Sequence, residues 1–214
     1  MIYIVTGHYG SGKTEVSINL ALSRRVSTVI DLDIVNPYFR TADAKEKLSS
    51  SGIELIAPQY ANTNVDMPTV PSEVYSVFNG HGDVVIDVGG DDAGAVALGQ
   101  YNKYIKQNRY EMYFVINACR PMTATAELTV GLLKDIEAAS RLGVTKLINN
   151  TNIKGETTVD MIISGQSMVD EVSQITGIPA WAVSGQKELL DKINTDLLKI
   201  PLELHLRLPW ERGV

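Results

Sequence analysis

The stretch of sequence that decides the fold is Gly7-His8-Tyr9-Gly10-Ser11-Gly12-Lys13-Thr14. It fits the pattern G-x-x-x-x-G-K-[ST], in which a glycine-rich loop leads from a β-strand into a helix. The flanking sequence matches this pattern, because the apolar run Ile2–Thr6 precedes the loop and a helix-periodic stretch, Lys13–Arg24, follows it. Glycines let the backbone bend tightly, so that its N–H groups converge on an anion at the positive end of the helix dipole. The sequence therefore predicts a polyphosphate-binding loop at residues 7–14.

The last two residues of this loop carry its side-chain chemistry. Lys13 supplies a mobile positive charge for the β- and γ-phosphates, and Thr14 offers a hydroxyl ligand to Mg²⁺. The backbone of the remaining residues is expected to cradle the phosphates, and these residues are Gly7, His8, Tyr9, Gly10, Ser11 and Gly12.

Two further apolar runs carry carboxylates, residues 29–33 with Asp31 and Asp33 and residues 84–90 with Asp87. If the first run is extended, Asp31 and Asp33 point to the same side of the strand. In the second run Asp87 follows three apolar residues and precedes two glycines, which allow the backbone to approach a γ-phosphate. Because Mg²⁺ prefers oxygen ligands and keeps several of its waters, these carboxylates predict a metal site. The predicted metal set is Thr14, Asp31, Asp33 and Asp87.

The rest of the chain alternates short apolar runs with helix-periodic stretches. Strands are predicted at residues 2–6, 27–32, 53–57, 83–88, 112–117, 146–149 and 180–183, and helices at 13–24, 41–49, 71–78, 93–107, 123–142 and 157–175. The strand runs are apolar almost throughout, which indicates a sheet buried on both faces and therefore mostly parallel. The sequence thus predicts a single α/β domain over residues 1–214, with a doubly wound, mostly parallel β-sheet and helices on both faces.

Two segments depart from this alternation. Residues 59–69 form a long loop-like stretch, and loops of this length are often functional. Residues 200–209 alternate apolar and other residues and contain two prolines, which predicts a strand-like C-terminal arm at a sheet edge or against another subunit.

The composition of the chain argues against several classes of protein. The formal net charge is −6, so nucleic-acid binding is not expected without a concentrated basic patch. The single cysteine, Cys119, cannot form an internal disulfide, which fits a reducing compartment. Without an apolar run of about 20 residues or a basic amphipathic tail, no membrane association is expected. A cytoplasmic protein is the expectation.

With these motifs the chain resembles the MinD/ParA/CobQ-like (SIMIBI) branch of P-loop NTPases. The resemblance rests on the early loop, on residues 31–37 at the switch I position, on residues 87–90 at the Walker B and switch II position, and on residues 149–152 after a late strand. It implies ATP, Mg²⁺ and a nucleotide-dependent homodimer.

The same resemblance implies roles for individual residues. Asp33 orients the attacking water, Asp31 supports switch I or the metal, and Asn150, with Asn149 as the alternative, reads the base. The expected catalytic residues are Lys13, Asp33 and Asp87. One departure stands out, because His8 occupies the place of the signature lysine that many relatives use across a dimer.

These observations favour a Mg²⁺-dependent ATP-binding protein with slow ATPase activity. It would act as a nucleotide-driven switch or as a maturation or delivery factor, on a protein or small-molecule partner that the sequence does not identify. One alternative is an ATP-dependent ligase or kinase whose substrate lies under residues 59–69. A GTPase is less favoured, because residues 150–152 lack the Lys and Asp of a guanine-reading N-K-x-D motif.

Overall fold

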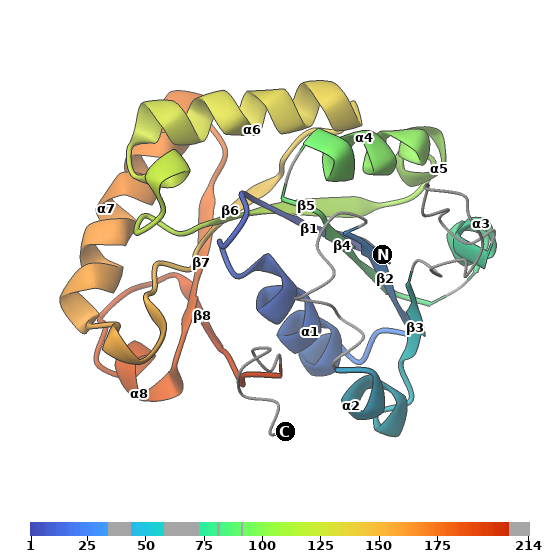
Figure 1. Cartoon of the computed structure of the whole chain (residues 1–214), viewed down its shortest axis with the longest axis horizontal. Helices are drawn as coiled ribbons and strands as arrows, with labels where there is room; N and C mark the ends of the chain where they lie inside the picture. Colours follow the sequence, from blue (N-terminus) through green and yellow to red (C-terminus); the bar gives the residue numbers. More distant parts are fainter. Residues whose placement is uncertain (34–43, 58–72, 81, 91, 206–214) are drawn as a thin grey trace, which may run out of the picture.

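The computed structural model describes residues 1–33, 44–57, 73–80, 82–90 and 92–205. Within these residues a sheet of eight strands runs in the order β3-β2-β4-β1-β5-β6-β7-β8 (Figure 1). Every neighbouring pair is parallel. The strands are β1 Ile2–Thr6, β2 Thr28–Leu32, β3 Glu54–Ile56, β4 Val84–Val88, β5 Tyr110–Ile116, β6 Lys146–Asn149, β7 Ala180–Gly185 and β8 Leu198–Pro201. The predicted doubly wound parallel sheet is confirmed.

Helices cover both faces of this sheet (Figure 1). The α-helices are α1 Lys13–Arg24, α2 Lys45–Ser50, α3 Glu73–Phe78, α4 Asp92–Gln100, α5 Asn102–Lys106, α6 Ala126–Ser140, α7 Val159–Thr176 and α8 Lys187–Leu190, with short 3-10 turns η2 Pro121–Thr123 and η3 Lys154–Glu156. Helices α1 and α2 lie on one face, whereas α4 and α6 lie on the other. No helix in the described part of the chain has both the length and the apolar character that crossing a bilayer requires.

The prediction of one helix over residues 93–107 is wrong, because this stretch forms two helices, α4 and α5. Tyr101 lies between them and is buried against Phe78, with 5.7 Å between the ring centroids. The side chain of Asn102 donates a hydrogen bond to the carbonyl of Gly99. Such side-chain bonds to the backbone compete with helical ones and favour a break.

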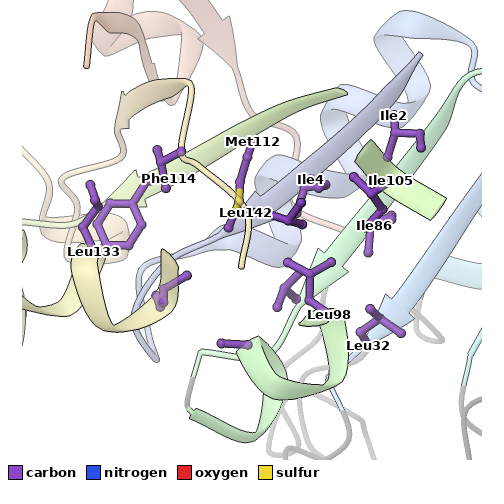
Figure 2. Packing of buried hydrophobic residues seen from close by; sticks show 14 of the residues in the cluster. Ile2, Ile4, Leu32, Ile86, Leu98, Ile105, Met112, Phe114, Leu133 and Leu142 are labelled. Atoms are coloured by element: carbon purple, nitrogen blue, oxygen red, sulfur yellow. The ribbon is translucent and has the colours of Figure 1, made fainter. Parts of the chain in front are cut away.

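Side chains of the central strands point alternately to the two faces of the sheet, where they form two hydrophobic cores. In β1, Ile2 and Ile4 enter the core under α4 and α6, whereas Tyr3 and Val5 enter the core under α1. Figure 2 shows the first of these cores, in which Ile4, Ile86 and Met112 approach one another from neighbouring strands. Because both faces are buried, these strands read as continuous apolar runs.

The predicted C-terminal arm at residues 200–209 corresponds in part to β8. This strand begins two residues earlier, at Leu198, and pairs in parallel with β7 at the edge of the chain's own sheet. After β8 the backbone of Glu203 forms two 2.9 Å hydrogen bonds with the side-chain amide of Asn19 on α1. The N–H of His205 donates to the carboxylate of Glu15, at 3.0 and 3.1 Å. The rest of the predicted arm, residues 206–209, lies outside the described residues.

Replacing Asn19 with alanine is expected to lower the free energy of unfolding by about 1–3 kcal/mol, because its side chain bonds Glu15 and both backbone groups of Glu203. Urea denaturation measures this change. The control is Asn79→Ala, at an exposed position beyond α3, where a change within about 0.5 kcal/mol is expected. Equal stabilities for the two variants would contradict the assignment of Asn19 as the attachment point of this segment.

Candidate functional site

The predicted site residues gather at the carboxyl edge of the sheet. Strand β1 lies between β4 and β5, so the chain turns to β2 on one side after β1 and passes to β5 on the other side after β4. Such a reversal of strand order opens a crevice at the carboxyl ends of the strands, where ligands of α/β proteins bind. Residues 7–14 leave β1 at this crevice and lead directly into α1.

The loop has the backbone conformation that its glycines predict. Gly10 and Gly12 have φ angles of 75° and 83°, in the left-handed region where other residues are strained. Gly12 is the N-cap of α1, so the N–H groups of the first helical turn point into the loop. Lys13 and Thr14 are only 5% and 7% exposed, and both side chains are therefore held inside the site.

The carboxylates predicted for the metal site lie beside each other on neighbouring strands. Asp31 of β2 is the register partner of Asp87 of β4. The Oδ1 atom of Asp31 accepts a 2.9 Å hydrogen bond from the N–H of Asp33. This bond links the two residues that were expected to lie on the same side of the strand. All three residues are buried, Asp87 with 1% exposure.

Asp87 is held by Ser17, which is not among the site residues that the sequence predicts. The hydroxyl of Ser17, on α1, donates a 2.8 Å hydrogen bond to Oδ1 of Asp87 and also contacts the carbonyl of Lys13 at 3.0 Å. A signal was present, because Ser17 follows Lys13 by one helical turn and so shares its face. The Oδ2 atom of Asp87 is buried and has no hydrogen-bond partner among the described residues.

Burial and the neighbouring Asp31 raise the pKa of Asp87 from 3.8 to about 7. Lys13 and the hydroxyls of Ser17 and Thr14 act in the opposite direction. A desolvated carboxylate with an unpartnered oxygen gains stability when a cation approaches.

These groups fit the chemistry of Mg²⁺, which takes oxygen ligands and needs only one or two carboxylates because it retains waters. Asp87 provides the orphaned oxygen and Thr14 the buried hydroxyl. Within the described ranges there is no group of three or more His, Cys, Asp or Glu side chains that could hold a metal.

The backbone after β4 touches the phosphate loop. A Cβ atom placed on Gly90 would lie 2.6 Å from the N atom of Tyr9 and 2.9 Å from Nζ of Lys13. Only glycine allows this approach, so the backbone at Gly90 lies directly against the loop and the ammonium of Lys13.

The two asparagines predicted to read a base are buried behind the loop. Asn150 donates a 2.7 Å hydrogen bond from Nδ2 to the carbonyl of Ser11 and accepts one of 3.0 Å from Ser184. Asn149 donates to the carbonyl of Ile162 and to the side chain of Gln166, at 3.0 and 3.1 Å. Both amides are therefore engaged with the protein, and base reading by either one stays a prediction.

The exposed part of the loop is its tip. Tyr9 is 55% exposed, and Nδ1 of the half-buried His8 lies 3.0 Å from the carbonyl of Tyr9. On the other side of the loop, Nε of Arg120 donates a 3.0 Å hydrogen bond to the carbonyl of Gly10. Of the site segments named from sequence, residues 34–37 and the loop at 59–69 lie outside the described residues.

Solved structures with a similar fold include two FtsY proteins and one signal recognition particle protein. The signal recognition particle receptor FtsY from Elizabethkingia anophelis is 19% identical with a TM-score of 0.52, over 96% of this chain and 62% of that chain. FtsY from Thermotoga maritima is 17% identical with a TM-score of 0.56, over 92% and 65%. The signal recognition particle 54 kDa protein from Aeropyrum pernix is 18% identical with a TM-score of 0.54, over 84% and 40%.

The chain thus spans less than two thirds of the length of each of these three structures. Neither a protein-family model nor a curated protein matches the chain. At these identities the likeness concerns the fold alone, and it confirms the predicted P-loop NTPase fold. It does not single out the MinD/ParA branch.

The raised pKa of Asp87 predicts a pH-dependent effect of Asp87→Asn in the protein free of nucleotide and metal. Well below pH 3.8 the carboxyl is protonated in both folded and unfolded chains, but above pH 7 the folded state must hold a buried charge that the unfolded state solvates. The wild type therefore loses stability between these values, and the amide variant does not.

We expect the difference in melting temperature between D87N and wild type to be larger at pH 8 than at pH 5, as measured by circular dichroism. The matched control is Asp135→Asn on the exposed face of α6, whose difference should not change with pH. If D87N and D135N gave the same pH profile, Asp87 would not be the desolvated group described above.

Proposed function

We propose that this chain is a Mg²⁺-dependent, nucleoside triphosphate-binding switch with slow hydrolytic activity. The observation that carries the proposal is the burial of Lys13 and Asp87 in one site beside a glycine-rich loop, with one oxygen of Asp87 lacking a hydrogen-bond partner among the described residues. A buried ammonium and a buried carboxylate with an unpartnered oxygen are complementary to a phosphate with its metal ion.

Each residue of the site has a role in this proposal. The N–H groups at the start of α1 and the ammonium of Lys13 would bind the β- and γ-phosphates. Thr14 and Asp87 would hold Mg²⁺, which neutralises charge on the phosphates when bound. Asp33, buried at the end of β2, would position the attacking water.

A switch requires that the protein respond to the γ-phosphate. The segment after β4 supports this, because Gly90 lies against Tyr9 and Lys13 with no room for a side chain. Adding a phosphate beside Lys13 would therefore shift the backbone at Gly90, as γ-phosphate contacts order the switch segments of other NTPases. The exposed Tyr9 at the loop tip is available to a second copy or to another partner.

Two observations favour different bases. The Aeropyrum pernix structure of similar fold was solved in complex with GDP, which favours GTP. Residues 150–152 read Asn-Thr-Asn and lack a carboxylate that would accept the N–H groups of guanine, which favours ATP. The proposal therefore covers a purine nucleoside triphosphate, and the binding experiment decides between ATP and GTP.

A cytoplasmic location stays a prediction from the single cysteine.

Lys13→Ala is expected to weaken Mg-nucleotide binding at least 100-fold, since it removes the buried charge that faces the phosphates. Isothermal titration calorimetry with Mg-ATP and with Mg-GTP measures the affinity and identifies the base. The control is Lys134→Ala on the exposed face of α6, which should bind like the wild type. An absence of heat with both nucleotides for the wild type would refute the proposed function, and equal affinities for K13A and K134A would remove Lys13 from the site.

Asp33→Ala is expected to lower the turnover number at least tenfold while changing the nucleotide affinity less than threefold, because it acts on the water and not on the ground-state phosphates. Phosphate release under saturating Mg-nucleotide gives the turnover, and calorimetry gives the affinity. A D33A variant with wild-type turnover would take Asp33 out of catalysis and leave the binding proposal intact.

A further inference from the structure

Arg120 reaches the phosphate loop from the opposite side of the crevice to Asp87. Its Nε atom donates a 3.0 Å hydrogen bond to the carbonyl of Gly10, which lies 110 residues earlier in the chain. The guanidinium packs closely on that glycine, because a Cβ at Gly10 would lie 3.2 Å from Nε and 3.6 Å from Cδ and Cζ. The contact is therefore specific to one carbonyl of the loop.

The segment that presents Arg120 is firmly held. The N–H of Arg120 donates to the carbonyl of Asn117 at 3.0 Å, and its own carbonyl accepts from the N–H of Thr123 at 3.0 Å. Asn117 and Thr123 are both fully buried. The amide of Asn117 also bonds both backbone groups of Asn152, at 2.9 and 3.2 Å, which joins this segment to the loop after β6. The backbone at Arg120 is thus fixed, and its half-buried side chain is held through the bond from Nε to Gly10.

Holding the Gly10 carbonyl restricts the conformation of the loop. A trans peptide places its C=O and N–H on opposite sides, so the bond from Arg120 turns the next N–H, that of Ser11, away from Arg120. That N–H donates to the carbonyl of His8 at 3.1 Å and closes a turn. Asn150 holds the following carbonyl, that of Ser11, which directs the N–H of Gly12 away from Asn150.

We propose that Arg120 is a positioning residue of the phosphate loop, whose Nε–H holds the Gly10 carbonyl so that the loop is preformed before an anion enters. This inference rests on the proposed function for its ligand, a nucleoside di- or triphosphate. Preorganisation strengthens binding because the ligand does not have to order the loop. The role depends on the hydrogen-bond donor at Nε and not on the charge of the guanidinium. It therefore affects the binding of diphosphates and triphosphates alike.

Two variants distinguish the effect of the hydrogen-bond donor at Nε from the effect of the positive charge of Arg120. In Arg120→Gln the amide Nε2 stands at the same number of bonds from Cα as Nε of arginine, so the donor remains without the charge. In Arg120→Met a methyl group occupies that place, so the length remains without the donor. The loss of one such bond is expected to weaken both Mg-nucleoside diphosphate and triphosphate binding about 5- to 10-fold in R120M, with R120Q within about twofold of wild type.

Calorimetry with the preferred nucleotide of the wild type gives these affinities, and hydrogen exchange of the amides of residues 8–13 in the nucleotide-free protein gives a second readout. We expect faster exchange in R120M than in R120Q or wild type, with unchanged exchange in the strands. Wild-type affinity in R120M would overturn the inference, as would R120Q as weak as R120M, which would assign the effect to the charge. A loss confined to the triphosphate would also overturn it, since it would indicate a direct γ-phosphate contact.

Failure of the proposed function gives a different result. If the wild type binds neither nucleotide, the proposed function fails, and the inference about a nucleotide-binding loop fails with it. If the wild type binds and R120M binds equally well with unchanged amide exchange, only the role of Arg120 is refuted.

Discussion

The burial of Asp87 is the constraint on which the rest of the site depends. Its carboxylate lies beside Asp31 on the next strand, under α1, and one of its oxygens has no partner among the described residues. A charge in such a place is costly by itself, and its pKa near 7 reflects that cost. Ser17 and Lys13 reduce the cost without removing it. The charged carboxylate therefore lowers the stability of the folded chain, and a cation at this position would offset that loss.

A parallel sheet explains how such a site is assembled. Because all described strands run in one direction, the residues that follow β1, β2, β4, β5 and β6 meet at one edge. The phosphate loop, the carboxylates and the supporting side chains each come from a different strand end. The continuous apolar strands, buried on both faces, hold these ends in register.

The phosphate loop is held by side chains as well as by its glycines. Arg120 bonds the carbonyl of Gly10, and Asn150 bonds the carbonyl of Ser11, from the loops after β5 and β6. Asn117 and Asn152 connect these two loops to each other. The loop thus lies between the carboxylate side, at Asp87, and a supporting side, and the supporting hydrogen bonds explain how flexible glycines can form one defined conformation.

Much of this was predictable from local patterns. Strand β1 and helix α1 have the predicted bounds, because a period of two or of 3.6 with a glycine-rich junction is a property of a few neighbouring residues. Lys13, Thr14, Asp31, Asp33 and Asp87 are all buried, and their roles as site residues stay predictions. The break at Tyr101 was missed, since it depends on contacts with α3, which the local pattern does not contain.

The sequence by itself determined the class of fold, the phosphate loop and the pair of acidic strand ends, since each of these follows from residue types at short spacing. Only the tertiary structure decided which polar side chains support the loop and Asp87. Ser17 is 70 residues from Asp87, Asn150 is 139 from Ser11, and Arg120 is 110 from Gly10. Hydrogen bonds across such separations exist because the sheet brings distant strand ends together, and no local pattern encodes that approach.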